Sequence, residues 1–178
     1  MPALNNDLYT IDYIYALPDE KRAELIDGNI YYMAPPSGSH QLILSNLATD
    51  INLHIRNIRG ECKVFPAPYA VFLNNDNYNY VEPDISVICD KNKLDDKGCH
   101  GAPDFIIEIV SPSSRKMDYM TKLFKYRSAG VREYWIVDPI RKMVRTYDFI
   151  NDDTADFSFT DKIPVAIYPG FELSIIDE

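Results

Sequence analysis

The sequence predicts an α/β or α+β fold in which helices cover both sides of a β-sheet. Apolar residues between Leu44 and Ile58 recur at i, i+3, i+4 and i+7, a spacing typical of a helix with one buried face. Three runs rich in β-branched and aromatic residues follow, and after them a second helical segment and a further strand. This order of helix, three strands, helix and strand indicates a sheet sandwiched between helices.

The first part of the chain predicts a short helix and a β-hairpin. The helix is expected from Ile11 to Leu17. The hairpin strands, Ala23 to Ile26 and Ile30 to Ala34, flank Asp27-Gly28, a turn pair that tolerates positive φ. These elements form an N-terminal unit of about residues 10–34 ahead of the long helix.

The long helix and the strands after it form the middle of the chain. Ser37 or Ser39 can cap the helix, and Gly60 marks its end. The run from Phe105 to Val110 is apolar on both faces apart from Glu108, which indicates a central strand covered on both sides. The three strands are expected at Cys62 to Leu73, Tyr80 to Cys89 and Asp104 to Val110.

A second helix and a β-rich end complete the chain. The helix is expected from about Arg115 to Ala129, with Gly130 as its stop. Its apolar residues Met120, Leu123 and Phe124 are expected to point inward. The strands expected after it run from Glu133 to Asp138 and, as a hairpin partner, from Lys142 to Phe149.

Length and composition indicate one globular domain over residues 1–178. The chain is 46% hydrophobic and 25% charged, and a chain of this size needs neither disulfides nor a structural metal to fold. Its 3 cysteines, an odd number without a C-x-x-C pair, argue for a reducing compartment and against a disulfide framework or a zinc ribbon. Because no segment resembles a signal peptide or a membrane span, a soluble cytoplasmic protein is expected.

The charge distribution excludes a protein that coats nucleic acid by bulk charge alone. The chain has 18 basic and 27 acidic residues, a net charge of −9. However, the stretch from Arg115 to Arg145 holds nine basic and three acidic residues, so it carries +6 and the rest carries −15. This stretch is either a basic face for a polyanion or a solvated helix surface. Candidate nucleic-acid contacts are His40, Arg115, Lys116 and Lys125.

Two carboxylates stand where secondary-structure propensity alone would not place them. Asp84 opens the apolar run Ile85 to Ile88, and Glu108 interrupts the most hydrophobic strand of the chain. A buried charge costs several kcal/mol unless something neutralises it. The neutralising group is either a basic side chain in a structural ion pair or a divalent cation held between the two carboxylates.

The helix after Glu108 favours a catalytic interpretation. Asp118 and Lys122 lie one helical turn apart, so both can share a face. A helix entered directly from the strand of Glu108 packs beside that strand, which brings Lys122 within reach of the carboxylates. Two acids and a lysine around one point suit metal-dependent hydrolysis of a phosphodiester. Lys122 alone would otherwise be interpreted as an ordinary exposed helix lysine.

The motifs around these residues resemble those of the bacterial Uma-two family of the restriction-endonuclease-like PD-(D/E)XK nucleases. The resemblance covers about residues 10–175. Its motifs are Pro83-Asp84, the block Gly101-Ala102-Pro103-Asp104-Phe105-Ile106-Ile107-Glu108-Ile109-Val110-Ser111-Pro112-Ser113-Ser114, then Asp118, Lys122, Tyr126, Gly130-Val131 and Glu133-Tyr134-Trp135-Ile136-Val137-Asp138-Pro139. Upstream, Glu24-Leu25-Ile26-Asp27-Gly28 and His40 also match.

The resemblance implies a role for each matched acidic and basic residue. Asp84 corresponds to the aspartate of the P-D element and Glu108 to the acid of the E-x-K element, and both would bind the metal. Val110 stands at the position of the superfamily lysine. Family members commonly share this change and carry a lysine on the following helix, which Lys122 matches. Glu24 matches a family glutamate and is either a member of the site or a hairpin surface carboxylate.

These implications define the expected function. The fold is a restriction-endonuclease-like core with a mixed central sheet flanked by helices, over about residues 38–140, followed by a β-rich extension over about residues 141–178. The expected activity is Mg²⁺- or Mn²⁺-dependent hydrolysis of DNA by a homodimer. The alternatives are a nucleic-acid-binding or dimerisation module that does not cleave, and a hydrolase of another phosphate ester.

Overall fold

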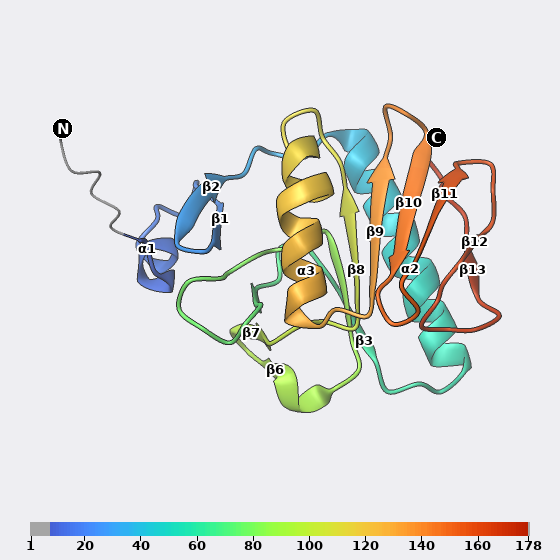
Figure 1. The fold of residues 1–178 in the computed structure, drawn as a ribbon, viewed down its shortest axis with the longest axis horizontal. Helices are drawn as coiled ribbons and strands as arrows, with labels where there is room; N and C mark the ends of the chain where they lie inside the picture. Colours follow the sequence, from blue (N-terminus) through green and yellow to red (C-terminus); the bar gives the residue numbers. More distant parts are fainter. Residues whose placement is uncertain (1–7, 178) are drawn as a thin grey trace.

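The computed structural model describes residues 8–177, and its centre is a six-stranded mixed sheet (Figure 1). The strands lie in the order β11-β10-β9-β8-β5-β3. Within this six-stranded sheet β8 and β9 are the one parallel pair, and the helical segment between them makes the crossover that a parallel pair requires. The strands are β3 (Lys63–Pro66), β5 (Ile85–Ile88), β8 (Phe105–Ile109), β9 (Glu133–Asp138), β10 (Met143–Asp148) and β11 (Asp153–Ser158).

Helices cover the two faces of this sheet, as the sequence predicted. Helix α2 (Gly38–Asn57) lies behind the sheet in Figure 1, and helix α3 (Leu123–Ala129) lies in front of it. Alternate residues of β8 separate into two cores: Phe105 and Ile107 pack in the cluster that contains α2, and Ile106 packs in the cluster that contains α3. The strand is therefore buried on both faces, and Glu108 lies on the α3 side.

The long helix α2 follows its predicted pattern closely. Ser37 is the N-cap, because its side chain accepts a hydrogen bond from the backbone amide of His40. Ile43, Leu47 and Ile51 are fully buried at the spacing expected for one apolar face. The helix ends at Asn57, three residues before Gly60. The N-terminus of α2 is thereby fixed close to the start of β5, where Asp84 lies.

The predicted middle strands are shorter than expected, and small elements surround the sheet. The run from Cys62 to Leu73 divides into β3 and β4, because its prolines cannot donate to a ladder. The run from Tyr80 to Cys89 is a regular strand only at β5. The surrounding elements are α1 (Ile11–Tyr15), β1 (Ala23–Ile26), β2 (Asn29–Tyr32), β4 (Val71–Phe72), η1 (Lys91–Lys93), β6 (Leu94–Asp95), β7 (Gly98–His100), β12 (Ile163–Pro164) and β13 (Glu172–Leu173).

The second helix differs from its prediction in geometry and in the face that it buries. It begins with a π-helical segment, η2 (Met117–Lys122), and continues as α3. Met120 and Phe124 are 61% and 67% exposed, so the prediction that they point inward is wrong. The face turned to the sheet instead carries Asp118, Lys122 and Tyr126, all buried. Hydrogen bonds and ion pairs to the carboxylates below, not apolar periodicity, determine the orientation of this helix.

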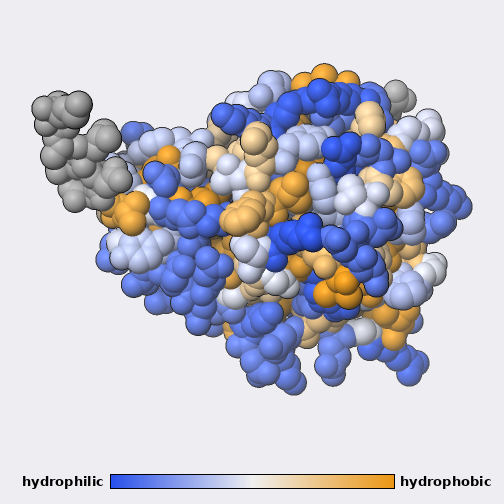
Figure 2. Space-filling model, in the orientation of Figure 1, coloured by the Kyte–Doolittle hydropathy of each residue, from blue (hydrophilic) through white to orange (hydrophobic). Residues whose placement is uncertain are grey.

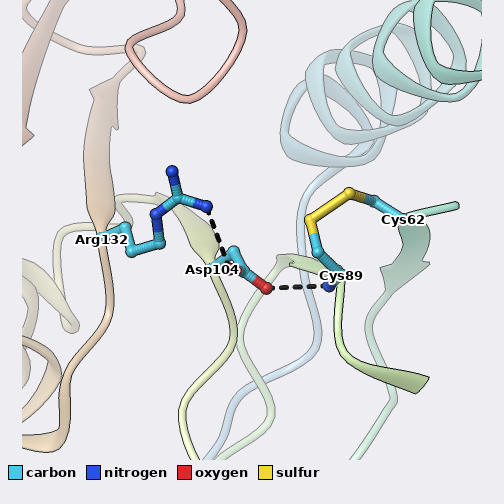
Figure 3. The surroundings of a disulfide bond; sticks show 4 residues. All are labelled: Cys62, Cys89, Asp104 and Arg132. Carbon is cyan, nitrogen blue, oxygen red and sulfur yellow. Dashed lines mark hydrogen bonds and ion pairs between the residues drawn. A yellow bond between two sulfur atoms is a disulfide. The ribbon is translucent and has the colours of Figure 1, made fainter. Parts of the chain in front are cut away.

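The cysteines also differ from the prediction, because Cys62 and Cys89 form a disulfide (Figure 3). Strands β3 and β5 pair antiparallel with Lys63 opposite Ile88, so the next residues outward lie opposite each other. Only Cys99 is free, and it is buried. In Figure 3, Asp104 accepts a hydrogen bond from the amide of Cys89 and pairs with Arg132. The odd number of cysteines argued against disulfides and for a reducing compartment. That interpretation is wrong for Cys62 and Cys89, which are paired.

The surface is mixed in character. Figure 2 shows hydrophobic side chains scattered among hydrophilic ones over the face in view. Within residues 8–177, no helix combines the length and the apolar character that crossing a bilayer requires.

Candidate active site

Asp84 and Glu108 lie opposite each other at one end of the β5–β8 pair. These strands are antiparallel with Ile85 opposite Ile107, so the next step of the register places Asp84 opposite Glu108 and on the same face. The amide of Asp84 donates to Oε2 of Glu108 at 3.4 Å, and the amide of Ile109 donates to Oδ2 of Asp84 at 2.7 Å. The backbone of the two strands thus holds both carboxylates in place.

Glu108 is buried, and two side chains of the helix above bind the same oxygen. The ammonium of Lys122 donates to Oε1 of Glu108 at 3.0 Å, and the hydroxyl of Tyr126 donates to it at 2.6 Å. Lys122 and Tyr126 are four residues apart, so one face of the helix supplies both donors. Val110, at the position of the superfamily lysine, is buried in the apolar cluster below α3. The helix therefore supplies the positive charge that the strand lacks.

Glu24 also belongs to this cluster, although it comes from the N-terminal hairpin. Its carboxylate lies 2.8 Å from Nζ of Lys122, and it also accepts the amide of Glu82 at 3.0 Å. Asp118 lies 3.8 Å from the same ammonium. Three carboxylates therefore surround Lys122, and the alternative of Glu24 as a hairpin surface residue is excluded by its burial.

His40 connects the N-terminus of α2 to Asp84. Its Nε2 lies 3.2 Å from Oδ2 of Asp84, and its ring is largely buried. Burial opposes the charged imidazolium, but the hydrogen bond and the charge of Asp84 outweigh it and raise the pKa of His40. His40 therefore contacts a carboxylate of the cluster and orients it.

Burial also changes the ionisation of the cluster. It raises the pKa of Glu108 well above its usual range, and the neighbouring Asp118 and Asp84 raise it further, while the Lys122 ammonium opposes the change. Repulsion from the neighbouring carboxylates therefore contributes to the raised pKa of Glu108, but burial is the main cause.

The model of the Uma2 family, described as "Putative restriction endonuclease", matches residues 11–175. The chain belongs to the Uma2 family. It is 28% identical over 134 residues to an uncharacterized protein of Synechocystis sp.. The aligned region covers 75% of this chain and 68% of that protein. The crystal structure of a putative nuclease belonging to DUF820 from Anabaena variabilis superposes with a TM-score of 0.74 and 25% identity, covering 93% of this chain and 94% of that one.

The carboxylates of this Uma2 member fit a divalent cation such as Mg²⁺. Asp84 uses Oδ2 for its bonds to Ile109 and His40, and Glu108 uses Oε1 for Lys122 and Tyr126. This leaves for a hard cation Oδ1 of Asp84 and Oε2 of Glu108, which accepts only the long hydrogen bond of 3.4 Å from the amide of Asp84. Residues 8–177 contain no group of three His, Cys, Asp or Glu side chains arranged as a metal site. A cation here would complete its shell with water and phosphate oxygens, as Mg²⁺ usually does.

The basic stretch from Arg115 to Arg145 is largely neutralised by ion pairs. Arg115 pairs with the buried carboxylate of Asp138 at 2.8 Å, and Lys125 pairs with Asp27 at the hairpin turn. Lys116 is exposed and has no ion-pair partner within residues 8–177. Seven of the nine basic residues in the stretch are paired: Arg115, Lys122, Lys125, Arg127, Arg132, Lys142 and Arg145.

The pairing separates the predicted nucleic-acid contacts into two groups. Arg115 and Lys125 are held by protein carboxylates, and His40 lies inside the carboxylate cluster. Of these four predicted contacts, only Lys116 presents a charge without an ion-pair partner within residues 8–177. The interpretation of this stretch as a broad basic face therefore loses most of its support.

Two members of the cluster were not assigned a role from the sequence. Both were recognised as parts of the family motif, and Asp118 also as a neighbour of Lys122 on the helix. The signal that identifies both is their spacing, because Asp118, Lys122 and Tyr126 lie four residues apart on one helical face. Polar residues at i, i+4 and i+8 form a continuous stripe along a helix. Such a stripe would have indicated a helix that turns its polar face inward and leaves apolar side chains exposed.

Asp118 makes the stability of the protein depend on pH. Burial raises its pKa to about 6, against the opposing charge of Lys122 and a hydrogen bond from Ser114. An aspartate titrates near pH 4 in an unfolded chain, so between about pH 4 and 6 the folded state binds more protons and stability falls as the pH rises. Asp118→Asn removes this loss, and we expect its unfolding free energy relative to wild type to rise by up to about 3 kcal/mol between pH 4 and pH 8.

Urea denaturation at pH 4, 6 and 8 measures this difference. The exposed Asp19 provides the matched control, and Asp19→Asn should change the unfolding free energy equally at all three values. A constant difference between Asp118→Asn and wild type across this range would contradict the expectation.

Proposed function

We propose that this Uma2 member hydrolyses phosphodiester bonds of DNA in a reaction that depends on Mg²⁺ or Mn²⁺. The observation that carries the proposal is the juxtaposition of Asp84 and Glu108 across β5 and β8, with the Lys122 ammonium bound to Glu108. The family description and the structural neighbour support a nuclease in general. The metal and the substrate are the parts that we propose.

Each residue of the cluster has a distinct task in this proposal. Asp84 and Glu108 would hold the cation, which supplies a polarised phosphoryl oxygen and an activated water. Lys122 places a positive charge next to the negative charge that develops on the phosphoryl group. Glu24 holds Lys122 in position, and His40 orients Asp84 by hydrogen bonding to Oδ2. The buried surroundings strengthen these interactions, because less water screens them.

We also propose that the active form is a homodimer. Residues 8–177 contain one cluster of this kind, whereas cutting both strands of a duplex usually requires two sites related by a two-fold axis. The exposed edge of β11 and the strands of the C-terminal extension offer surfaces for such pairing.

Cleavage of supercoiled plasmid tests both proposals in one assay. With Mg²⁺ the protein should convert the plasmid directly to the linear form, and EDTA should abolish the reaction. Accumulation of nicked plasmid alone would exclude paired sites acting together. DNA binding without cleavage at any concentration of Mg²⁺ or Mn²⁺ would favour the non-cleaving module. Hydrolysis of p-nitrophenyl phosphate with intact plasmid would favour a hydrolase of another phosphate ester.

A further inference from the structure

The N-terminal hairpin presents an aromatic side chain beside the carboxylate cluster. Strands β1 and β2 pair antiparallel with Glu24 opposite Tyr31. Residues directly opposite each other in such a pair project from the same face, with Cβ atoms about 5 Å apart. Glu24 projects toward Lys122, so Tyr31 projects from the face of the hairpin that is turned to the cluster.

The ring of Tyr31 is free to contact a ligand. It keeps 36% of its surface exposed, and within residues 8–177 it makes no hydrogen bond or aromatic contact. The next residue, Tyr32, lies on the opposite face and bonds to the hydroxyl of Tyr13 at 2.9 Å. The hairpin thus carries two adjacent exposed tyrosines, and only Tyr31 faces the cluster.

The hairpin lies at a distance that suits a nucleotide. On the other side of β1 from β2, Leu25 exchanges backbone hydrogen bonds with Tyr80, four residues before Asp84. Tyr31 is therefore about two strand spacings, roughly 10 Å, from the segment that leads to Asp84. This separation is comparable with the reach of a nucleotide from its phosphate to its base.

Electrostatic attraction to DNA is weak in this protein, so another source of affinity is needed. The net charge is −9, and most of the basic residues from Arg115 to Arg145 are already paired with carboxylates. The basic residues without an ion pair within residues 8–177 are spread along the chain, and the excess of acidic residues opposes the neutralisation of phosphates, which is the main source of affinity for an undistorted duplex. Stacking of an unpaired base on an aromatic ring supplies about 1–3 kcal/mol without any charge.

We propose that Tyr31 stacks on an unpaired nucleobase next to the phosphodiester bound at Asp84 and Glu108. DNA with an unpaired nucleotide at the point of cleavage, such as a flap or a bulge, is then bound more tightly than the perfect duplex that the proposed homodimer also cuts. The proposal rests on the proposed function, because it places the cleaved bond at the carboxylates. Tyr31 acts as a specificity-determining residue and takes no part in the bond cleavage itself.

Fluorescence anisotropy with Ca²⁺ in place of Mg²⁺ tests the stacking with a cation available to the carboxylates, and gel electrophoresis of the recovered probe establishes that it is not cleaved. The probes are a labelled single-stranded 20-mer, the same sequence as a perfect duplex, and that duplex with one unpaired nucleotide. Tyr31→Ala should weaken binding of the single strand and of the bulged duplex by about 5- to 150-fold, which corresponds to about 1–3 kcal/mol. Tyr31→Phe should bind as wild type, because the ring is kept. Tyr32→Ala is the matched control on the opposite face of the hairpin and should also bind as wild type.

The outcomes separate the stacking from the nuclease function. If wild type binds or cleaves DNA and Tyr31→Ala does the same with equal affinity, the stacking is wrong and the nuclease proposal survives. Equal losses from Tyr31→Ala and Tyr32→Ala, or an equal loss on the perfect duplex, also overturn the stacking. If wild type neither binds nor cleaves any of the three probes, both proposals fail.

Discussion

Replacing Asp84 by Asn, or Glu108 by Gln, is expected to lower the rate of DNA cleavage by about 10³-fold or more. Each amide keeps the shape of the carboxylate but removes the negative charge that would hold a divalent cation. A loss of 10³-fold corresponds to about 4 kcal/mol of transition-state stabilisation, in the range that a catalytic cation contributes. Single-turnover cleavage of a labelled oligonucleotide measures the rate, and titration calorimetry with Mn²⁺ measures the cation affinity.

The control for these variants is an exposed carboxylate outside the cluster. Asp19→Asn should retain wild-type rate and Mn²⁺ binding, because Asp19 lies in an exposed turn. Circular dichroism and thermal unfolding establish that each variant is folded before its rate is compared. A rate within about threefold of wild type for Asp84→Asn, with unchanged Mn²⁺ affinity, would show that the carboxylates are not the metal site.

Replacing Lys122 by Ala is expected to destabilise the protein by about 3–5 kcal/mol. The substitution leaves the buried carboxylates of Glu24 and Glu108 without their cation, and breaking a buried ion pair on one side carries a cost of this size. Although burial opposes the charge on Lys122, Glu108 and Glu24 raise its pKa well above its usual range, so the side chain is charged at neutral pH. Urea denaturation at pH 7 measures the unfolding free energy.

Two further variants distinguish the loss of charge pairing from other effects. Lys116→Ala removes an exposed lysine six residues earlier and should change the unfolding free energy by no more than about 0.5 kcal/mol. Adding Glu24→Gln to Lys122→Ala should recover part of the lost stability, because one uncompensated charge is removed. A loss below about 1 kcal/mol in Lys122→Ala, or no recovery in the double variant, would contradict this account of the cluster.

Local patterns predicted most of the fold. The apolar spacing of α2, the turn at Asp27-Gly28 and the two-sided hydrophobicity of β8 depend on residues close together in the chain, and each prediction was confirmed. The second helix ends at Gly130 as predicted and Leu123 packs against the core, but the prediction that Met120 and Phe124 point inward is wrong. Contacts to Glu24 and Glu108, which are distant in sequence, place the polar face of that helix toward the sheet.

The sequence by itself determined that Asp84 precedes an apolar strand, that Glu108 stands within another, and that Lys122 follows on the next helix. Only the tertiary structure decided how these residues meet. Strand register depends on pairing between segments that are distant in the chain. Register places Asp84 opposite Glu108 at one end of β5 and brings Cys62 opposite Cys89 at the other. The hairpin adds Glu24 in the same way, and ion pairs with remote carboxylates neutralise the basic stretch whose charge is visible in the sequence. Such pairings lower the free energy only once the chain has folded. They therefore cannot be predicted from the spacing of residues along the chain.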